Sequence, residues 1–359
     1  MSFRITKILD YDLDGAYCTL VQYEDVKILL DCGLPTSCDV SQYELSREIL
    51  KDVNLILISS PELENSGALF LFSNHLIRGE AAYVTEPVKK LLSINALLEV
   101  GKLLCVRTDV TSATEACKHL DVVLANLREI KMRQKVKIYF GRVKVKFQAC
   151  AKGKSLGSCA FELSVDGYSL AYAIDYSIKN ELHIRSDLIE FFNQRQVDLF
   201  ITNFSSNVPN ADFEDALFQY METSLSSEKR VIILLEQVSR LFEYVLLIRK
   251  LFRSRKIFRK IAIPFIYQSY MAHIKNYTEY MSGSVDKRYT IEEYVYADDL
   301  LFVKSITDDE RIGSLVCICT PIDVFGSRLH EKKDESILLV QVEPINKLRM
   351  QSIRNSEIH

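Results

Sequence analysis

The chain has 359 residues, more than a usual single domain, so two domains are expected. Hydrophobic residues make up 48% of it, with only 7 prolines and 12 glycines, which predicts a compact globular protein. The 45 basic and 48 acidic side chains leave a net charge of -3. This balance excludes a global field that would attract nucleic acid or a membrane, so any such binding has to be local.

The N-terminal segment Met1–Lys7 lacks the apolar core of a signal peptide, and no apolar run approaches the length of a membrane span. We therefore expect an intracellular protein without a membrane partner. The nine cysteines are scattered and form no Cys-x-x-Cys pair. This pattern predicts reduced core thiols rather than a zinc knuckle or a redox centre.

The first half of the chain mixes short β-like runs with helical patterns. Strands are expected at residues 3–9, 18–23, 26–31, 53–58, 81–85, 136–140, 143–150, 160–165, 169–174 and 197–202, the last one buried. Helices are expected at 42–51, 67–75, 86–104 and 113–129. Strands arrive both as hairpins and between helices, which favours an αββα sandwich over a strictly alternating parallel sheet.

The second half alternates helix and strand, which is typical of a small α/β domain. Strands are expected at 230–235, 261–266 and 315–319, and helices at 212–224, 237–252 and 269–280. We therefore predict a first domain over residues 1–205, a second domain over 206–345 and a C-terminal tail over 346–359.

The segment after the strand at 53–58 deserves comparison with metallohydrolases. It reads Ser-Ser-Pro-Glu-Leu-Glu-Asn-Ser-Gly-Ala-Leu-Phe from Ser59 and contains no histidine. Zinc-dependent enzymes of the metallo-β-lactamase type carry His-x-His-x-Asp-His-x-Gly after this strand, and those side chains bind two zinc ions. On that pattern the ligand positions are occupied by Ser60, Glu62, Glu64 and Asn65.

Three further segments extend the comparison along the chain, namely Leu29–Gly33, Gly153–Gly157 and Tyr172–Asp175. Together with the loop after Ser59 they resemble the β-CASP branch of the metallo-β-lactamase superfamily, the nucleases of RNA 3′-end processing. In the second half, Ser239-Arg240 and Pro264–Tyr267 are similar to segments of the β-CASP insert. The resemblance implies an α/β fold, with a metallo-β-lactamase αββα sandwich and a β-CASP α/β domain.

Within this branch the chain is most similar to the family of non-catalytic hundred-kilodalton subunits of the cleavage and polyadenylation specificity factor. The resemblance implies no catalytic residue, no metal and no cofactor, and a nuclear role in pre-mRNA cleavage and polyadenylation. The partners implied are the active β-CASP endonuclease subunit and a symplekin-like helical-repeat scaffold. The degenerate nuclease paralogue of the Integrator complex is an open alternative, because it shares the fold and the ligand loss.

Lys154 stands where the resemblance places a ligand histidine, and Asp175 stands where it places the bridging aspartate. An ammonium has no free lone pair and repels a dication. We hypothesise that Lys154 partly replaces the metal by pairing with Asp175 and with Glu62 or Asp31, which would make its removal cost roughly 3–5 kcal/mol if the pair is fully buried. The alternative is that Lys154 points to solvent from a glycine-rich loop.

An active hydrolase is the alternative from a different class of protein. A single magnesium or manganese ion would then be held by Asp31, Glu62, Glu64 and Asp175, since carboxylates suit these metals better than zinc. The dispersed histidines offer little to such a site, and His183 is expected at the surface or at a helix cap.

Two basic stretches provide candidate RNA contacts. Residues 249–260 contain seven basic side chains, among them Arg253, Arg255 and Lys256. Arg142, Lys144 and Lys146 alternate with valines, so one strand face should carry all three charges. The plainer interpretation is a solvated helix end and a polar sheet face, because acidic runs elsewhere offset these charges.

Overall fold

The computed structural model describes residues 3–10, 15–35, 41–72, 76, 81–95, 121–193, 195–203, 230–235, 238–256, 259–282, 299–303, 316–319 and 337–341. The chain divides into two compact units. Unit 1 comprises Met1–Asn180 and Arg185–Ser205, and unit 2 comprises Glu181–Ile184 and Ser206–His359. Four residues of the first half of the chain thus belong to unit 2.

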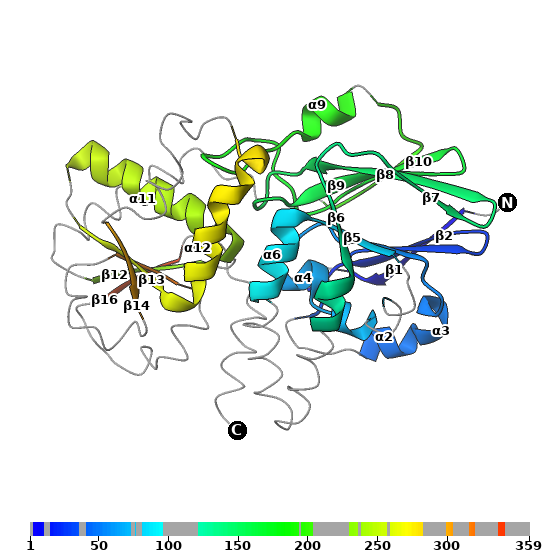
Figure 1. Cartoon of the computed structure of the whole chain (residues 1–359), viewed down its shortest axis with the longest axis horizontal. Helices are drawn as coiled ribbons and strands as arrows, with labels where there is room; N and C mark the ends of the chain where they lie inside the picture. The colour runs from blue at the N-terminus through cyan, green and yellow to red at the C-terminus, as the bar shows by residue number, and fades with distance from the viewer. Residues whose placement is uncertain are drawn as a thin grey trace. The chain divides into compact units, whose positions relative to one another are not determined.

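The first sheet of unit 1 has the strand order β1-β2-β3-β4-β5-β6 (Figure 1). Its strands are β1 (Phe3–Leu9), β2 (Cys18–Tyr23), β3 (Val26–Leu30), β4 (Leu55–Leu57), β5 (Ala81–Thr85) and β6 (Leu127–Ile130). The first three strands are antiparallel, with a two-residue turn between β2 and β3, and β3 to β6 are parallel. Their carboxyl ends therefore lie along one edge of the sheet, where loops can place polar side chains.

The second sheet of unit 1 has the order β11-β10-β9-β8-β7. It contains β7 (Val136–Phe140), β8 (Val143–Ala151), β9 (Cys159–Val165), β10 (Tyr168–Ala173) and β11 (Leu199–Thr202). The first four strands form an antiparallel meander, and β11 joins β10 in parallel. Alternate residues of these strands, such as Val145, Phe147, Phe161 and Leu163, are wholly or nearly wholly buried between the two sheets.

Helices cover the outer faces of both sheets, which gives four layers. Side chains of α2 (Ser41–Leu45), α3 (Arg47–Leu50), α4 (Leu63–Ser66) and α6 (Glu86–Asn95) pack in one core with the first sheet. Leu188 and Phe191 of α9 (Leu188–Asn193) pack on the second sheet against Cys150, Ala160 and Ala173. The predicted αββα sandwich is confirmed.

Unit 2 is built on a parallel sheet of order β14-β13-β15-β12-β16. Its strands are β12 (Arg230–Leu234), β13 (Ile261–Pro264), β14 (Leu300–Val303), β15 (Val316–Cys319) and β16 (Ile337–Gln341). The long helix α11 (Leu241–Arg255) follows β12, and α12 (Gln268–Ile274) follows β13 after a 3₁₀ turn. Strands buried on both faces read as continuous apolar runs, which is why β12 and β13 are recognisable in the sequence.

Several predicted elements differ from the structure. The helix expected at 42–51 is two short helices, α2 and α3, and the helix expected at 67–75 starts earlier, as α4 from Leu63, and continues as a 3₁₀ turn over Leu69–Phe72. The helix predicted at 113–129 was extended too far, because residues 127–129 belong to strand β6 and pair with β5. The strand predicted as buried at 197–202 is the edge strand β11, and Leu199 and Phe200 are exposed. The helix predicted at 212–224 lies outside the described residues.

The five described cysteines, Cys18, Cys32, Cys150, Cys159 and Cys317, are free and buried, as predicted for core thiols. Burial raises the pKa of Cys18 and of Cys150 to about 12, so these thiols stay protonated near neutral pH. None of the helices in the described ranges has the length and apolarity needed to cross a bilayer.

Candidate functional site

Asp31 lies at the carboxyl end of β3 and is completely buried. Its backbone has a φ of 57°, in the left-handed region that aspartate tolerates better than most residues. One carboxylate oxygen accepts the Ser59 N–H at 2.7 Å. The other accepts the Ser59 hydroxyl at 2.7 Å, the Asn65 amide at 2.9 Å and the Tyr172 hydroxyl at 3.0 Å. Four donors, from the loop after β4, from α4 and from β10 of the second sheet, thus converge on one carboxylate.

Lys152 is the nearby cation that the sequence did not single out. It follows β8, is 0% exposed, and its ammonium donates to the Ser59 hydroxyl oxygen at 3.0 Å. The Ser59 hydroxyl in turn donates to Asp31, so a single hydroxyl links the ammonium to the carboxylate. A buried lysine is rare unless its charge is compensated, and Asp31 supplies that compensation.

The pKa of Asp31 reflects two opposing effects. Complete burial raises it, while the Lys152 charge and the hydrogen bonds from Asn65 and Ser59 lower it, and the net direction is upward. The donors and Lys152 thus favour the charged carboxylate, against the larger opposing effect of burial. Loss of the Lys152 charge would raise the pKa further.

The backbone around Asp31 packs directly on the turn that carries the compared loop positions. Cys32 N–H donates to Asn65 C=O at 2.9 Å, Leu34 N–H to Leu63 C=O at 2.9 Å, and Tyr17 N–H to Glu64 C=O at 2.7 Å. A Cβ on Gly33 would lie 1.7 Å from the Glu64 carbonyl oxygen, so only glycine fits there. This close approach fixes α4 relative to β3.

The residues at the four loop positions are buried and make hydrogen bonds to one another and to Asp31. The Ser60 hydroxyl donates to the Glu62 carboxylate, and the Asn65 amide donates to Asp31. Glu62 and Glu64 are only 3% and 6% exposed. Protein groups therefore supply several of the hydrogen bonds of this loop, while the buried Asn65 Oδ1 accepts none.

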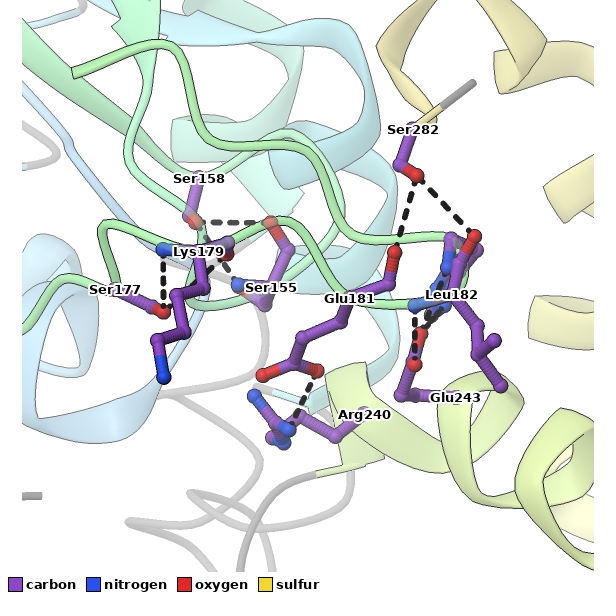
Figure 2. Close-up of polar contacts among 10 residues, drawn as sticks. Ser155, Ser158, Ser177, Lys179, Glu181, Leu182, Arg240, Glu243 and Ser282 are labelled. Atoms are coloured by element: carbon purple, nitrogen blue, oxygen red, sulfur yellow. Dashed lines mark hydrogen bonds and ion pairs between the residues drawn. The ribbon is translucent and has the colours of Figure 1, made fainter. Parts of the chain in front are cut away.

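Asp175 follows β10 and, like Asp31, has a left-handed backbone, with a φ of 46°. Its carboxylate pairs with the Lys154 ammonium at 3.2 Å, and its N–H donates to the Asn203 side chain at 2.8 Å. Gly153 has a φ of +77°, and a Cβ there would lie 2.4 Å from the Ser177 carbonyl oxygen. The turn after Gly153 is closed by Ser158, whose hydroxyl donates to Ser155 C=O at 2.8 Å (Figure 2).

These findings confirm the predicted pairing of Lys154 with Asp175 but correct its burial and its relation to Asp31. The Lys154 and Asp175 side chains are 22% and 19% exposed, so the pair is partly solvated rather than fully buried. The cation next to Asp31 is Lys152, two residues earlier. The alternative of a Lys154 that merely points to solvent is wrong.

The donor set does not fit the two zinc ions that the fold family implies. No histidine stands at the compared positions, and two ammonium groups, Lys152 and Lys154, lie beside the two aspartates where a dication would need charge attraction. The alternative of a single metal ion is not supported either. The described residues contain no group of three or more acidic, histidine or cysteine side chains able to hold a metal, so no such site is formed by Asp31, Glu62, Glu64 and Asp175. Both metal readings are thus disfavoured by the residues present.

A second buried polar cluster belongs to unit 2 and involves the four residues 181–184 (Figure 2). Glu243 of α11 accepts the N–H groups of Leu182 at 2.7 Å and His183 at 2.9 Å, and also bonds the His183 ring. Arg240 donates to Glu181 at 2.7 Å. Ser282 hydroxyl donates to Glu181 C=O at 3.0 Å. We call these residues the 181–184 anchor.

The prediction that His183 lies at the surface or at a cap is wrong. The ring is 0% exposed and meets Phe242 edge to face at 5.0 Å. Burial alone would raise the pKa of Glu243, but the His183 charge and the hydrogen bonds lower it. Burial raises the pKa of Glu181 despite the adjacent Arg240 guanidinium. No local signal in the sequence joins His183 to a glutamate sixty residues later.

The candidate RNA contacts are divided between the units. Arg253, Arg255 and Lys256 are exposed at the end of α11, whereas Arg249, in the same stretch, is buried and paired with Asp299 at 2.8 Å. Arg142 and Lys146 are exposed and Lys144 is half-buried, all on the β7–β8 hairpin of unit 1. As predicted, Lys144 and Lys146 share the outer face of β8, opposite the buried valines, but the prediction that Arg142 lies on the same strand face is wrong, because β8 begins at Val143 and Arg142 lies in the turn before it.

Comparison with known proteins adds relatives and a family. Residues 20–202, about half the chain, match the family described as the metallo-beta-lactamase superfamily domain. The cleavage and polyadenylation specificity factor subunit 2 of Oryza sativa subsp. japonica is 22% identical over 298 residues, covering 80% of this chain and 39% of the relative. The endoribonuclease ysh1 of Emericella nidulans is 22% identical over 333 residues, covering 86% and 37%. This chain therefore spans about two-fifths of the length of these curated relatives.

Among solved structures, a protein of unknown function from Enterococcus faecalis V583 aligns with a TM-score of 0.52 at 14% identity. The alignment covers 95% of this chain and 88% of that protein. At this identity the likeness concerns the fold alone.

Replacing Lys152 with methionine should lower the free energy of unfolding at pH 7 by roughly 3–5 kcal/mol, because it leaves the Asp31 charge buried without a cation. A raised carboxyl pKa in the folded state means that stability falls as pH rises from the unfolded value, about 3.9, to the folded one. Lys152→Met raises that folded pKa further, so its deficit should grow as pH rises above the folded pKa of Asp31 in the unmodified chain. Denaturation followed by circular dichroism measures both quantities.

The matched control is the pair Asp31→Asn and Lys152→Met together, which should be less destabilised at pH 7 than Lys152→Met alone, since no buried charge remains. Lys51→Met changes an exposed lysine and should alter stability by less than about 0.5 kcal/mol. A Lys152→Met deficit that stays constant across the pH range would contradict the coupling to Asp31.

Replacing Lys154 with alanine should cost only about 1 kcal/mol, because the Lys154–Asp175 pair is partly solvated. The loss should shrink in 1 M salt, where exposed charges are screened, while the Lys152→Met deficit should change little. Denaturant midpoints at low and high salt distinguish the two lysines. Equal salt sensitivity of both variants would show that their environments are alike.

Replacing Glu243 with glutamine should destabilise unit 2 by roughly 3–5 kcal/mol at pH 7, because the buried His183 loses its charged partner. A lowered carboxyl pKa contributes stability above the unfolded value, about 4.3, which disappears as pH falls through the folded value. The difference from the unmodified chain should therefore narrow below about pH 4. Exposed Glu279→Gln serves as the control, and a pH-independent difference would refute the role of the Glu243 charge.

Proposed function

We propose that this chain, which belongs to the metallo-β-lactamase superfamily, is a catalytically inactive subunit in the processing of mRNA 3′ ends. The observation that carries the proposal is the Lys152–Ser59–Asp31 chain of hydrogen bonds at the centre of the compared loop. A protein ammonium lies beside the aspartate that would otherwise face a metal. The positive charge that zinc supplies in the enzymes is here partly supplied by the protein itself.

Charge and hydrogen-bond capacity both support inactivity. Asp31 already accepts four hydrogen bonds, and Asp175 pairs with Lys154. Hydrolysis in this fold needs a metal-activated water, which requires ligand lone pairs and an open coordination position. Acquiring a metal here would require expelling two ammonium groups and restoring imidazoles at several positions at once.

The names of the relatives support a set of proposed partners. These relatives are subunits 2 and 3 of the cleavage and polyadenylation specificity factor and an endoribonuclease. We propose that this chain works in the nucleus, beside a histidine-complete β-CASP endonuclease and a symplekin-like scaffold, in pre-mRNA cleavage and polyadenylation. These names favour it over the Integrator alternative.

We also propose that unit 2 corresponds to the β-CASP-like domain, over residues 206–345 with a tail over 346–359. Its parallel sheet and the α11 helix, which carries Glu243 and directly follows Arg240, support this reading. The 181–184 anchor adds four residues that the sequence-based boundary at 205 assigned to the first domain.

Affinity purification of the tagged full chain from its own cells, followed by mass spectrometry, tests the proposal. We expect co-purification of a histidine-complete β-CASP endonuclease together with poly(A)-site factors. Recovery with Integrator subunits instead would move the chain to that complex, and recovery of the chain alone would overturn the subunit role.

A cleavage assay on a short RNA with added manganese tests inactivity separately. We expect no cleavage above the level of an Asp175→Ala variant. Cleavage by the unmodified chain that Asp175→Ala abolishes would overturn the assignment as an inactive protein, whatever its partners.

A further inference from the structure

Among the described helices, α9 is the one that packs on the outer face of the second sheet, and it lies towards one end of that face. Helix α9 packs on Cys150, Ala160 and Ala173, towards the carboxyl end of β8, and Figure 1 shows the β7–β8 hairpin at the opposite end of the sheet. The outward residues of that hairpin are Lys137, Tyr139, Lys144 and Lys146. We call these four residues the hairpin face.

The register of β7 and β8 brings like charges together. Lys137 is directly opposite Lys146, and Tyr139 is directly opposite Lys144. Directly opposed like charges destabilise an antiparallel pair, whereas mixed charges would have stabilised it. Arg142 adds a further exposed cation in the turn between the two strands. The arrangement therefore concentrates positive charge at a cost to the hairpin itself.

The acids of β9 and of the turn after it have partners outside the hairpin face. Glu162 on β9 bonds Gln148 and Arg195, and Asp166 in the β9–β10 turn accepts from Tyr23 at 3.4 Å. In the described part of the chain, none of the three lysines of the hairpin face forms an ion pair. Their charges are available to a ligand.

Tyr139 gives the hairpin face an aromatic surface. Its side chain is 58% exposed, and the Lys137 ammonium lies 4.8 Å from the ring centroid. The hydrogen bond from Lys137, followed by the charges of Lys137, Lys144 and Lys146, lowers the pKa of the phenol. The ring thus sits in a strongly positive local field on an open sheet.

We propose that the hairpin face binds single-stranded RNA. Lysines would contact the phosphates, and Tyr139 would stack on a base, as aromatic side chains on open sheets and grooves do. An acidic peptide would match the charge but would leave the exposed ring without a role. Lysines also protect sheet edges from aggregation, but that function needs neither opposed lysines nor an exposed tyrosine.

The other basic stretch is a weaker candidate. Arg249 is used in a buried pair with Asp299, and Arg253 and Arg255 lie in the last turn of α11, where cations complement the helix dipole. A phosphate there would meet the negative end of the helix. We therefore assign RNA contact to the hairpin face, which includes Lys144 and Lys146.

This inference goes beyond the proposed function, because it concerns a surface remote in the sheet from the Asp31 loop and needs no partner subunit. Its test uses the full chain alone, so a failure of co-purification and a failure of RNA binding are separate results. The probe is a fluorescein-labelled 20-nucleotide oligouridine, and fluorescence anisotropy is measured between 50 and 200 mM salt.

Lys144→Glu with Lys146→Glu should weaken binding at least about tenfold and reduce the salt slope by about one to two. Tyr139→Ala should weaken it about fivefold or more, and Tyr139→Phe should restore most of the affinity, since stacking needs the ring and not the hydroxyl. Circular dichroism confirms that each variant is folded.

Lys51→Glu with Lys90→Glu is the matched control, because it makes the same change in net charge away from the hairpin. It should keep nearly full affinity. An equal loss in this control would attribute binding to net charge and overturn the proposal, as would unchanged affinity in the hairpin variant. If polyglutamate competes with the RNA and Tyr139→Ala leaves the affinity unchanged, the ligand is an acidic protein. This result would also overturn the proposal of RNA binding.

Discussion

The hydrogen bonds to the buried Asp31 carboxylate hold together the elements that form the candidate site. Ser59 comes from the end of β4, Asn65 from α4 and Tyr172 from β10, and Lys152 approaches through the Ser59 hydroxyl. A charge in the interior costs several kcal/mol unless donors surround it, so each of these elements is confined to a position from which it can donate. The carboxylate thus fixes the sheet-to-sheet spacing at this end of the sandwich. A metal ion would impose a similar constraint, and here protein donors supply it.

Much of unit 1 was predictable because its strands have one buried face. The alternation in Val143–Ala151 gave the orientation of Lys144 and Lys146 correctly, since a slip of one residue would have put both lysines in the core. The family resemblance was also confirmed, because short segments at strand ends keep their types even when ligands change. The helix assigned to residues 127–129 was wrong because pairing with β5 outweighs local helical periodicity. The prediction that Leu199 and Phe200 are buried was wrong, because amino-acid composition does not reveal that a strand lies at the edge of a sheet.

The site was harder to predict than the fold, and the two lysines show why. Comparison of spacing pointed to Lys154, which does pair with Asp175. Strand alternation would have turned Lys152 outward, but β8 ends at Ala151, and beyond the strand the side chain direction is set by tertiary contacts. The same holds for His183, which is buried only because Glu243 on a helix sixty residues later supplies its partner. Both buried charges were invisible because compensation by a distant residue leaves no periodic signal.

The buried Lys152 ammonium and the Asp31 carboxylate compensate each other's charge. Substitution of either residue alone should therefore cost stability, which commits this site to holding the fold. Surface residues carry no such commitment, because their substitution usually alters stability by less than about 0.5 kcal/mol. Opposed lysines on β7 and β8 are an exception, since they cost stability in a position where a neutral pair would be tolerated. The contact between Lys137 and the Tyr139 ring offsets part of this cost, and a ligand that binds the remaining charge would offset more. We therefore propose recognition on the hairpin face rather than at the Asp31 site.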